Sequence, residues 1–247
     1  MSLSEWWFPA LVVILAGFVK GVLGMGLPTI GIGLMGLVMS PVQAATIMMV
    51  PTSVTNVWQL LMGPSLWRII RRLWPLELGI VVGDWLGSGT MAHGDTALIR
   101  GCLGLVLITY SAIGLANRRI RVNPAHEWWM GPIAGLIAGL LTVATGVTSV
   151  PLVPYLTGLE GVERDDLVQS LGLSFGIAAT GLIIDLLSSG VMTQRLLIIS
   201  ALAVLPAMAG MQFGTAVRST ISAGTFRRCL LIGMLALGVE LARHFFV

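Results

Sequence analysis

A single lysine, Lys20, lies inside the first long apolar stretch of the chain. A cation at the centre of a bilayer costs on the order of 2.5–3.5 kcal/mol, so it normally faces a partner or a water-filled cavity. The alternative for such a long side chain is to snorkel to the membrane interface. Lys20 comes one helical turn before Gly24 and Gly26. We therefore expect it to lie near unwound backbone there and to pair with an anionic substrate.

Two glycine-containing stretches, GVLGMGLPTIG (21–31) and ATGVTSVP (144–151), offer groups that bind anions. The first resembles a dinucleotide fingerprint only superficially, because that motif needs a preceding strand and a later acidic residue. Within a membrane, glycines let a helix unwind, and the amides at the start of the next helix point at an anion. Close packing of helices through small residues is the alternative. The predicted substrate-binding residues are Lys20, Gly24, Gly26, Pro28, Thr29, Thr145, Gly146, Thr148 and Ser149.

Two aspartates, Asp84 and Asp185, lie well inside apolar segments. A buried carboxyl there indicates proton coupling or gating, a structural hydrogen bond, or an aspartyl protease pair. Residues 81–84 read V-V-G-D and lack the first glycine of a G-x-G-D signature, and Asp185 follows isoleucine rather than tyrosine. The protease is therefore disfavoured, and coupling or gating is the role we assign to both aspartates.

Other polar residues in the apolar segments receive weaker assignments. Arg100 and Arg227 begin two such segments and would suit entry and exit gates for an anion, although interface anchoring is the alternative. Asn56, Gln59 and Ser174 are candidates for lining a cavity. The chain has no H-E-x-x-H motif, no G-x-S-x-G elbow and no histidine cluster. We therefore expect no catalytic residue, metal or cofactor.

The composition places these residues in a membrane. Hydrophobic residues make up 56% of the 247 residues and charged residues only 10%, whereas a soluble domain has nearer a quarter of its residues charged. The net charge of +3 comes mostly from arginines between apolar runs, which is typical of membrane orientation signals. Nucleic-acid binding would require a basic groove with interleaved aromatic residues, and the sequence has none.

We predict an all-α integral membrane protein with about eight hydrophobic segments. They cover residues 8–39, 42–63, 73–92, 97–117, 131–157, 167–190, 195–217 and 225–246. Six are near the ~20 residues that cross a bilayer. The first and fifth are longer and are interrupted by glycine and proline, so each is expected to be a broken helix or a helical hairpin.

The two halves of the chain resemble each other. Gly17 and Gly21 match Gly135 and Gly139 at one offset, and a second set of matches follows at an offset nine residues larger, which the insertion at 158–166 explains. The second set pairs Gly63, Arg68, Gly83, Gly87, Arg100 and Cys102 with Gly190, Arg195, Gly210, Gly214, Arg227 and Cys229. Residues 1–122 and 123–247 are thus two homologous repeats within one membrane-embedded unit. Such repeats are typical of transporters whose site lies between the halves.

The arginines favour an inverted relation between the repeats. If the first and fifth segments are hairpins, each half crosses the membrane three times, and most arginines fall on one side. That side collects Arg68, Arg71, Arg72, Arg118, Arg119, Arg121, Arg164, Arg218, Arg227 and Arg228. Eight simple crossings would move several of them outside, against the positive-inside rule. The hairpin arrangement is therefore the one we expect.

The opening G-F-V-K-G-x-x-G-x-G, its weaker return in AGLIAGLLTVATG and the overall length resemble the TauE/SafE family of sulfite exporters. The residues that match are Gly17, Gly21, Gly24, Gly26, Gly135, Gly139 and Gly146. The family opening often contains three consecutive glycines, and here Leu27 and Pro28 interrupt that run. The resemblance implies a multi-pass transporter of the bacterial or archaeal inner membrane that moves sulfite, sulfoacetate or related anions.

The expected function is therefore secondary transport of a small sulfur-containing anion, a sulfonate or a carboxylate. The expected partners are the bilayer and the anion, without nucleic acid. The sequence leaves open whether a proton or a cation is coupled to transport and whether the chain forms oligomers. A membrane-embedded enzyme and a non-transporting assembly or sensor subunit are the alternatives. The first lacks a recognisable catalytic group, and the second lacks a soluble signalling domain.

Overall fold

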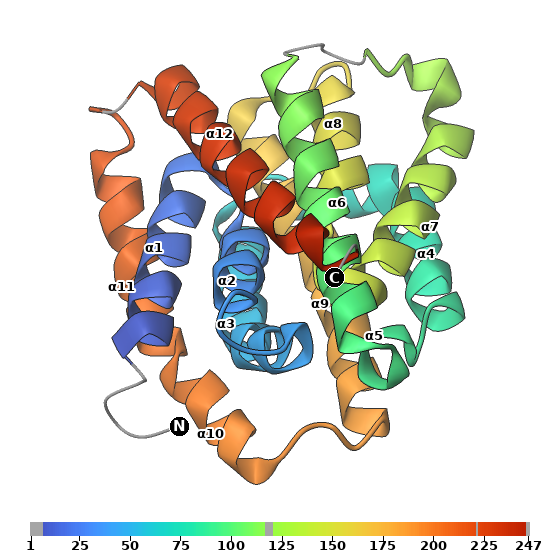
Figure 1. Ribbon diagram of the computed structural model, residues 1–247. Coiled ribbons are helices and arrows are strands. Elements are labelled where there is room, and N and C mark those ends of the chain that lie inside the picture. Colours follow the sequence, from blue (N-terminus) through green and yellow to red (C-terminus); the bar gives the residue numbers. More distant parts are fainter. Residues whose placement is uncertain (1–6, 117–120, 221, 246–247) are drawn as a thin grey trace.

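The computed structural model describes residues 7–116, 121–220 and 222–245, and these form a bundle of helices (Figure 1). The longer helices are α1 (Trp7–Leu23), α2 (Leu27–Met35), α3 (Pro41–Met62), α4 (Leu66–Leu86), α6 (Thr96–Leu115), α7 (Glu127–Thr145), α8 (Ser149–Gly158), α9 (Arg164–Ser188), α10 (Gln194–Leu202), α11 (Val204–Val217) and α12 (Ala223–Ala242). Short helices are α5 (Thr90–His93), η2 (Pro124–His126) and η3 (Arg243–Phe245). Arg118 and Arg119 lie outside the described residues.

Much of the surface suits lipid. Among the described residues, four helical stretches are long and apolar enough to cross a membrane: Thr96–Leu115, Pro124–Thr145, Asp165–Ser188 and Gln194–Val217. Large apolar side chains point outward, and among them Trp67 is 81% and Trp85 77% exposed. In water such a surface would be unfavourable, whereas acyl chains solvate it well.

The first apolar segment breaks where its glycines lie. Gly24 and Gly26 have φ angles of 82° and 103°, in the left-handed region that is open mainly to glycine. Pro28 lies in the first turn of α2, where its missing amide hydrogen leaves no intrahelical bond unmade. The chain turns back at this break, so that α1 and α2 form a helical hairpin (Figure 1).

The fifth segment breaks in the same manner. Gly146 ends α7 with a φ of 74°, and α8 begins at Ser149. The hydroxyl of Tyr155 in α8 donates to the carbonyl of Glu127 at the start of α7, at 3.4 Å. The end of α8 therefore returns to the beginning of α7, and these two helices form a second hairpin.

Glycines set the partner of each hairpin. A Cβ added at Gly17 or Gly21 would collide with the backbone of α11, and one added at Gly135 or Gly139 would collide with the backbone of α4. The contacts advance together along both chains, so α1 runs parallel to α11 and α7 runs parallel to α4. Each hairpin thus packs on a helix from the other half of the sequence.

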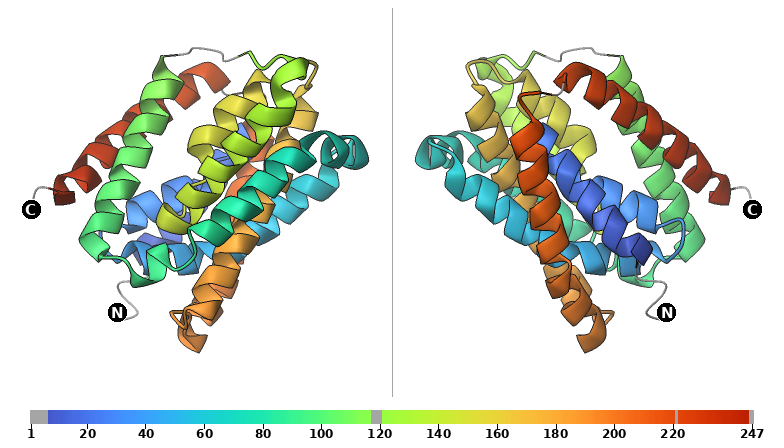
Figure 2. Two further views of the ribbon diagram at one scale, coloured as in Figure 1. Left: turned by 90° about the vertical axis from the view of Figure 1, so that its right-hand side faces the viewer. Right: turned by 90° about the vertical axis from the view of Figure 1, so that its left-hand side faces the viewer.

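The remaining long helices pair across the halves as well. α3 packs against α9, where Gly172 meets Leu60, and α6 packs against α12, where Gly104 meets Gly238. Figure 2 shows α6 and α12 as a pair at one flank of the bundle. The glycines again let the two backbones approach closely.

Three features differ from the expected segments. The expected segment 73–92 is divided, because α4 ends at Leu86 and a turn at Gly89, with a φ of 81°, precedes α5. Helix α4 begins at Leu66, seven residues before the expected segment, because Arg68 and Arg72 pair with Asp166 and Glu127 and so belong to the helix. The expected segment 195–217 is divided into α10 and α11 at Ala203. Placing the start of a helix after its charged residues therefore underestimates the length of a helix whose first turns carry ion-paired arginines.

Candidate functional site

The two hairpins meet at the N-terminal ends of their second helices. The Thr29 hydroxyl in α2 lies 3.2 Å from the Ser149 hydroxyl in α8, and both side chains are buried. The first amides of each helix have no intrahelical acceptor, and the helix dipole makes these ends positive. Two such ends that converge from different hairpins are suited to hold one anion between them.

Hydroxyl groups surround this meeting point. Thr142 donates to Thr148 at 2.9 Å, and the buried hydroxyl of Thr52 has no partner among the described residues. A cavity of about 20 Å³ lies here, lined by these three threonines with Pro28 and Gly146, and by apolar side chains such as Met48 and Phe175. That volume holds about one water molecule. The space is therefore nearly closed in this conformation.

The side chain of Lys20 in α1 is buried against α3, near the tip cavity. Its side chain is 1% exposed, and its Nζ donates to the Thr55 hydroxyl at 2.9 Å and to the Asn56 side-chain oxygen. Among the described residues no carboxylate lies within ion-pairing distance of it. A buried ammonium group with only neutral partners leaves a positive charge available for an anion.

A wider cavity leads to Lys20 from one end of the bundle. It has a volume of about 220 Å³ and is lined by residues that include Lys20, Gly24, Gln59, Asp165 and Arg218. The Gln59 amide nitrogen donates to the Gly24 carbonyl at 2.8 Å. This bond holds the unwound segment against α3, between the wider cavity and the hairpin tips.

The structure brings most of the predicted substrate-binding residues together. Gly24 and Gly26 form the break, Pro28 and Thr29 begin α2, and Thr148 and Ser149 begin α8. Thr145 is close in sequence, but its hydroxyl donates to Leu141 and accepts from the Val147 amide. It therefore stabilises the turn at Gly146, and its hydroxyl is already occupied.

The predicted cavity-lining residues divide into two groups. Asn56 and Gln59 face the site through Lys20 and Gly24. Ser174 instead donates to Glu77 in α4 at 2.6 Å, on the other side of α9. Glu77 is 8% exposed and was missed among the intramembrane acids. Its position inside the expected segment 73–92 was the available signal.

Asp84 and Asp185 line a cavity distinct from the tip cavity, although Leu182, next to the Gly181 that packs on Asp84, lines the tip cavity. Both are buried, and both line a cavity between α4 and α9. Asp185 accepts hydrogen bonds from the Ser88 hydroxyl and the Gly89 amide, each at 2.6 Å. The two aspartates are thus a separate site from the Lys20 cluster.

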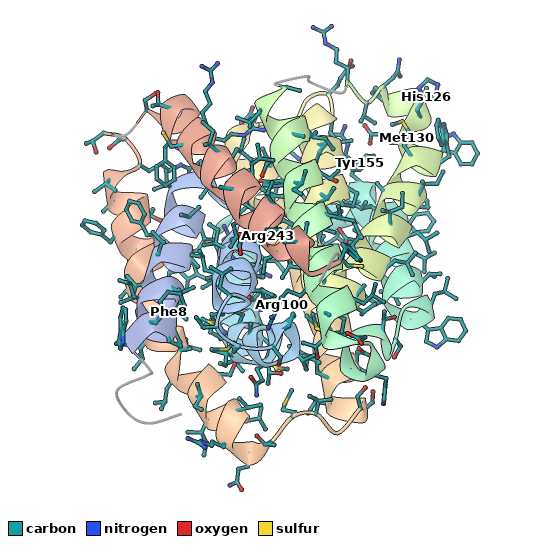
Figure 3. All side chains as sticks on the ribbon, in the orientation of Figure 1. Phe8, Arg100, His126, Met130, Tyr155 and Arg243 are labelled. Carbon is teal, nitrogen blue, oxygen red and sulfur yellow. The ribbon has the colours of Figure 1, made fainter. Side chains whose placement is uncertain are left out.

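The two predicted gating arginines lie at different helix ends. Arg100, at the start of α6, donates at 3.2 Å to the carbonyl of Met39, which follows α2 in the chain (Figure 3). Arg227 lies near the start of α12, within electrostatic range of Tyr110. Tyr110 in turn contacts the Met25 sulfur at 3.7 Å. Arg100 therefore contacts the chain just beyond α2, whereas Arg227 lies on α12 and is connected to the hairpin tip only through Tyr110.

A larger cavity carries fewer polar groups than these smaller ones. It has a volume of about 640 Å³ and is lined mainly by apolar side chains of α1, α3, α10 and α11, with Gln194 and Arg195 as polar exceptions. Across the described part of the chain, no group of three or more His, Cys, Asp or Glu side chains is placed to hold a metal ion. The polar groups capable of binding an anion are concentrated at the hairpin tips and Lys20.

A comparison with protein families matches residues 10–241 to the family described as Sulfite exporter TauE/SafE. No curated protein and no solved structure matches the chain. The family match covers both hairpins and every predicted site residue.

Proposed function

Because the chain belongs to the TauE/SafE family of sulfite exporters and is a multi-pass membrane protein of this transporter type, we propose that it carries a small sulfur-containing anion across the cytoplasmic membrane. Sulfite, sulfoacetate and other small sulfonates or carboxylates are the candidate substrates. The observation that carries the proposal is the meeting of Thr29 and Ser149, which joins two helix N-termini from the two halves of the chain.

The substrate lies between the hairpin tips in this proposal. The amides that begin α2 and α8, with the hydroxyls of Thr29, Thr148 and Ser149, bind its oxygen atoms. Lys20 supplies the counter-charge and reaches the site along α3, since Thr52 and Asn56 lie one helical turn apart on that helix. The apolar side chains around the hydroxyls accommodate the carbon part of an organosulfonate.

Two inverted repeats provide the architecture. In support, α1 pairs with α11 as α7 pairs with α4, while α3 pairs with α9 and α6 with α12. Exchange of the two halves at the boundary 122/123 reproduces every one of these pairs. The arginines Arg68, Arg72, Arg121, Arg218 and Arg227 lie at helix ends around one end of the bundle, which the positive-inside rule assigns to the cytoplasm.

Transport proceeds by alternating exposure of the site. The wider cavity gives access to Lys20 from the arginine-rich end, whereas the tip cavity is nearly closed. Arg100, which bonds to the segment after α2, and Arg227, near the start of α12, gate the two exits. Rocking of one repeat against the other around a fixed midplane site is the usual mode for inverted-repeat transporters.

Purified protein in liposomes tests the proposal. We expect exchange of labelled sulfite or a small sulfonate across the membrane, and competition between these anions. A protein that moves none of these anions, in either direction and under any gradient, contradicts transport. Turnover of the anion into a new product would favour the enzyme alternative instead.

A further inference from the structure

Asp84 in α4 and Asp185 in α9 share a cavity of about 350 Å³ that the substrate site does not use. The two side chains are only 6% and 3% exposed. The cavity's other lining residues are apolar except for Ser88 and Thr180. Because Trp85 and Ile184 are 77% and 61% exposed, this cavity opens onto the apolar outer face of the bundle. The two buried acids lie behind it, close enough for the charge of one to act on the other.

Most of their oxygen atoms have no partner. Both carboxyl oxygens of Asp84 and the Oδ2 of Asp185 are buried without a hydrogen bond, as far as the described residues go. No arginine or lysine of the described chain forms an ion pair with either acid. A buried carboxylate without compensation is strongly unfavourable. The two carboxyl groups therefore lack a positively charged group that would compensate their charge.

The acids form part of one seam between α4 and α9. Glu77 receives a hydrogen bond from Ser174 and Asp185 receives one from Ser88, and both pairs are 97 residues apart. Asp84 packs against Gly181 at the same spacing, where no larger side chain fits. The two helices thus run parallel with three acids along their contact.

The other elements around Asp84 contribute little charge. α7 presents Gly139 and Leu136 to this part of α4. On α5 the exposed His93 has its Nδ1 3.2 Å from the Gly89 carbonyl. The titratable groups that face the pair are therefore Glu77, two helical turns away on α4, and His93.

We propose that Asp84 and Asp185 form the coupling site of the transporter and that its ligand is a proton. This inference rests on the proposed transport function. When one of two nearby buried carboxyls is protonated, the repulsion between two buried charges is avoided. The proton enters from water onto a carboxyl oxygen and leaves to water on the opposite side, and no other bond changes.

Helix α9 connects this pair with the substrate site. Asp185 lies near its C-terminal end, and farther along the same helix Gly172 and Gly176 pack against Asn56, which accepts a hydrogen bond from Lys20. A change in charge at Asp185 alters its hold on Ser88 and Gly89. Because a packed helix moves as a unit, a shift of α9 is felt at Asn56.

The test compares two kinds of flux in liposomes, exchange of labelled sulfite at equal pH and net flux driven by a pH gradient. In Asp84→Asn and Asp185→Asn proteins we expect exchange to persist and the pH-driven flux to fall at least tenfold. Asparagine at 185 keeps the oxygen that accepts from Ser88 and Gly89. The matched control is Glu240→Gln, which neutralises an exposed acid on α12. A sulfonate of constant charge repeats the assay, because sulfite itself binds protons.

Several results would overturn the coupling site while the transport function stands. These are wild-type exchange with a net flux that ignores the pH gradient, a flux that follows sodium instead, and asparagine variants that keep pH-driven flux. If wild type shows neither exchange nor net flux, the proposed function itself fails. For a variant that does not fold, infrared difference spectra of wild type with labelled aspartate replace the flux assay, and absence of a buried protonated carboxyl band overturns the proposal.

Discussion

The ammonium group of Lys20 is held by a hydroxyl and an amide oxygen rather than by a carboxylate. We expect Lys20→Met to weaken sulfite binding about tenfold or more, because a hydrogen bond to a charged group contributes roughly 1.5–3 kcal/mol and each 1.4 kcal/mol is about tenfold. Calorimetric titration of the purified protein measures this. Arg243→Met removes an equally positive but exposed group and is expected to bind as wild type. Unchanged affinity in Lys20→Met would exclude Lys20 from the site.

The contact between Thr29 and Ser149 has its own test. In a double-mutant cycle with Thr29→Val and Ser149→Ala, we expect a coupling energy of about 0.5–1.5 kcal/mol in thermal stability, the net contribution of one hydrogen bond. Each single variant should also slow sulfite exchange. Thr220→Val, which removes an exposed hydroxyl bonded only to Val217, is the control. Strictly additive effects would mean that the two hydroxyls do not interact.

At this scale the sequence indicates the site only partly. Lys20, the glycines and the hydroxyls of Thr29 and Ser149 are predictable, because an isolated cation and a broken helix are unusual in an apolar run. Thr55 and Thr52 were not predictable, since threonine on a membrane helix commonly bonds its own backbone. Only the placement of α3 beside α2 and α11 brings these side chains to the tip cavity and within reach of the long Lys20 side chain.

The glycine contacts between helices belong to the scale of elements. We expect Gly21→Val and Gly139→Val each to lower thermal stability by about 1–3 kcal/mol or to prevent folding, because a side chain there meets the backbone of the paired helix. Gly233→Ala is the matched control, since nothing lies near its position on α12. An alanine there should be neutral or slightly stabilising. The melting temperature of each variant in detergent, measured as the loss of monodisperse protein on heating, checks these expectations. An unaltered melting temperature in the valine variants would contradict the close helix contact.

The helices themselves follow closely from hydropathy and helix-end chemistry. The expected segment 42–63 corresponds to α3, which begins after the Ser40 cap and ends before Gly63. The expected segment 195–217 does not include the break at Ala203, although Pro206 signals it, because proline has no amide hydrogen and leaves the carbonyl of Leu202 without its helical partner. A second contact near the break is not visible in the sequence, because it joins α10 to α3. The Ser200 hydroxyl donates to the Ile47 carbonyl, which Pro51 leaves without an amide partner.

The two hairpins make a prediction about the whole molecule. In a background without Cys102 and Cys229, single cysteines at Trp7 and Ser40 should react from one side of the membrane. Cysteines at Trp128 and Gly161 should react from the other, because each hairpin returns to its own side. Thr96 and Ala116, at opposite ends of α6, are the matched pair for a full crossing. Labels at Trp7 and Ser40 on opposite sides would contradict the inverted arrangement.

Which helix each hairpin packs against cannot be derived from sequence. The glycines of α1 predict a close neighbour, yet α2 and α3 are nearer along the chain than α11. The same stripe of small residues occurs on α4, α7 and α11, so pairing is decided by which surfaces are complementary once all are present. Repeat detection indicates equivalent helices, but it does not identify their partners.

The pairing of α1 with α11 also means that two helices in contact are synthesised at widely separated times. The glycine face of α1 is made first, and its partner ends at Val217. At roughly 5–20 residues per second, the ribosome needs roughly 10–40 s to deliver that partner. During this interval α1 lies in the membrane without its partner helix. Its glycine face and the charge of Lys20 are then covered by lipid, by the insertion machinery or by a neighbouring chain. Assembly of the second hairpin has no such delay, because α4 is already present when α7 emerges.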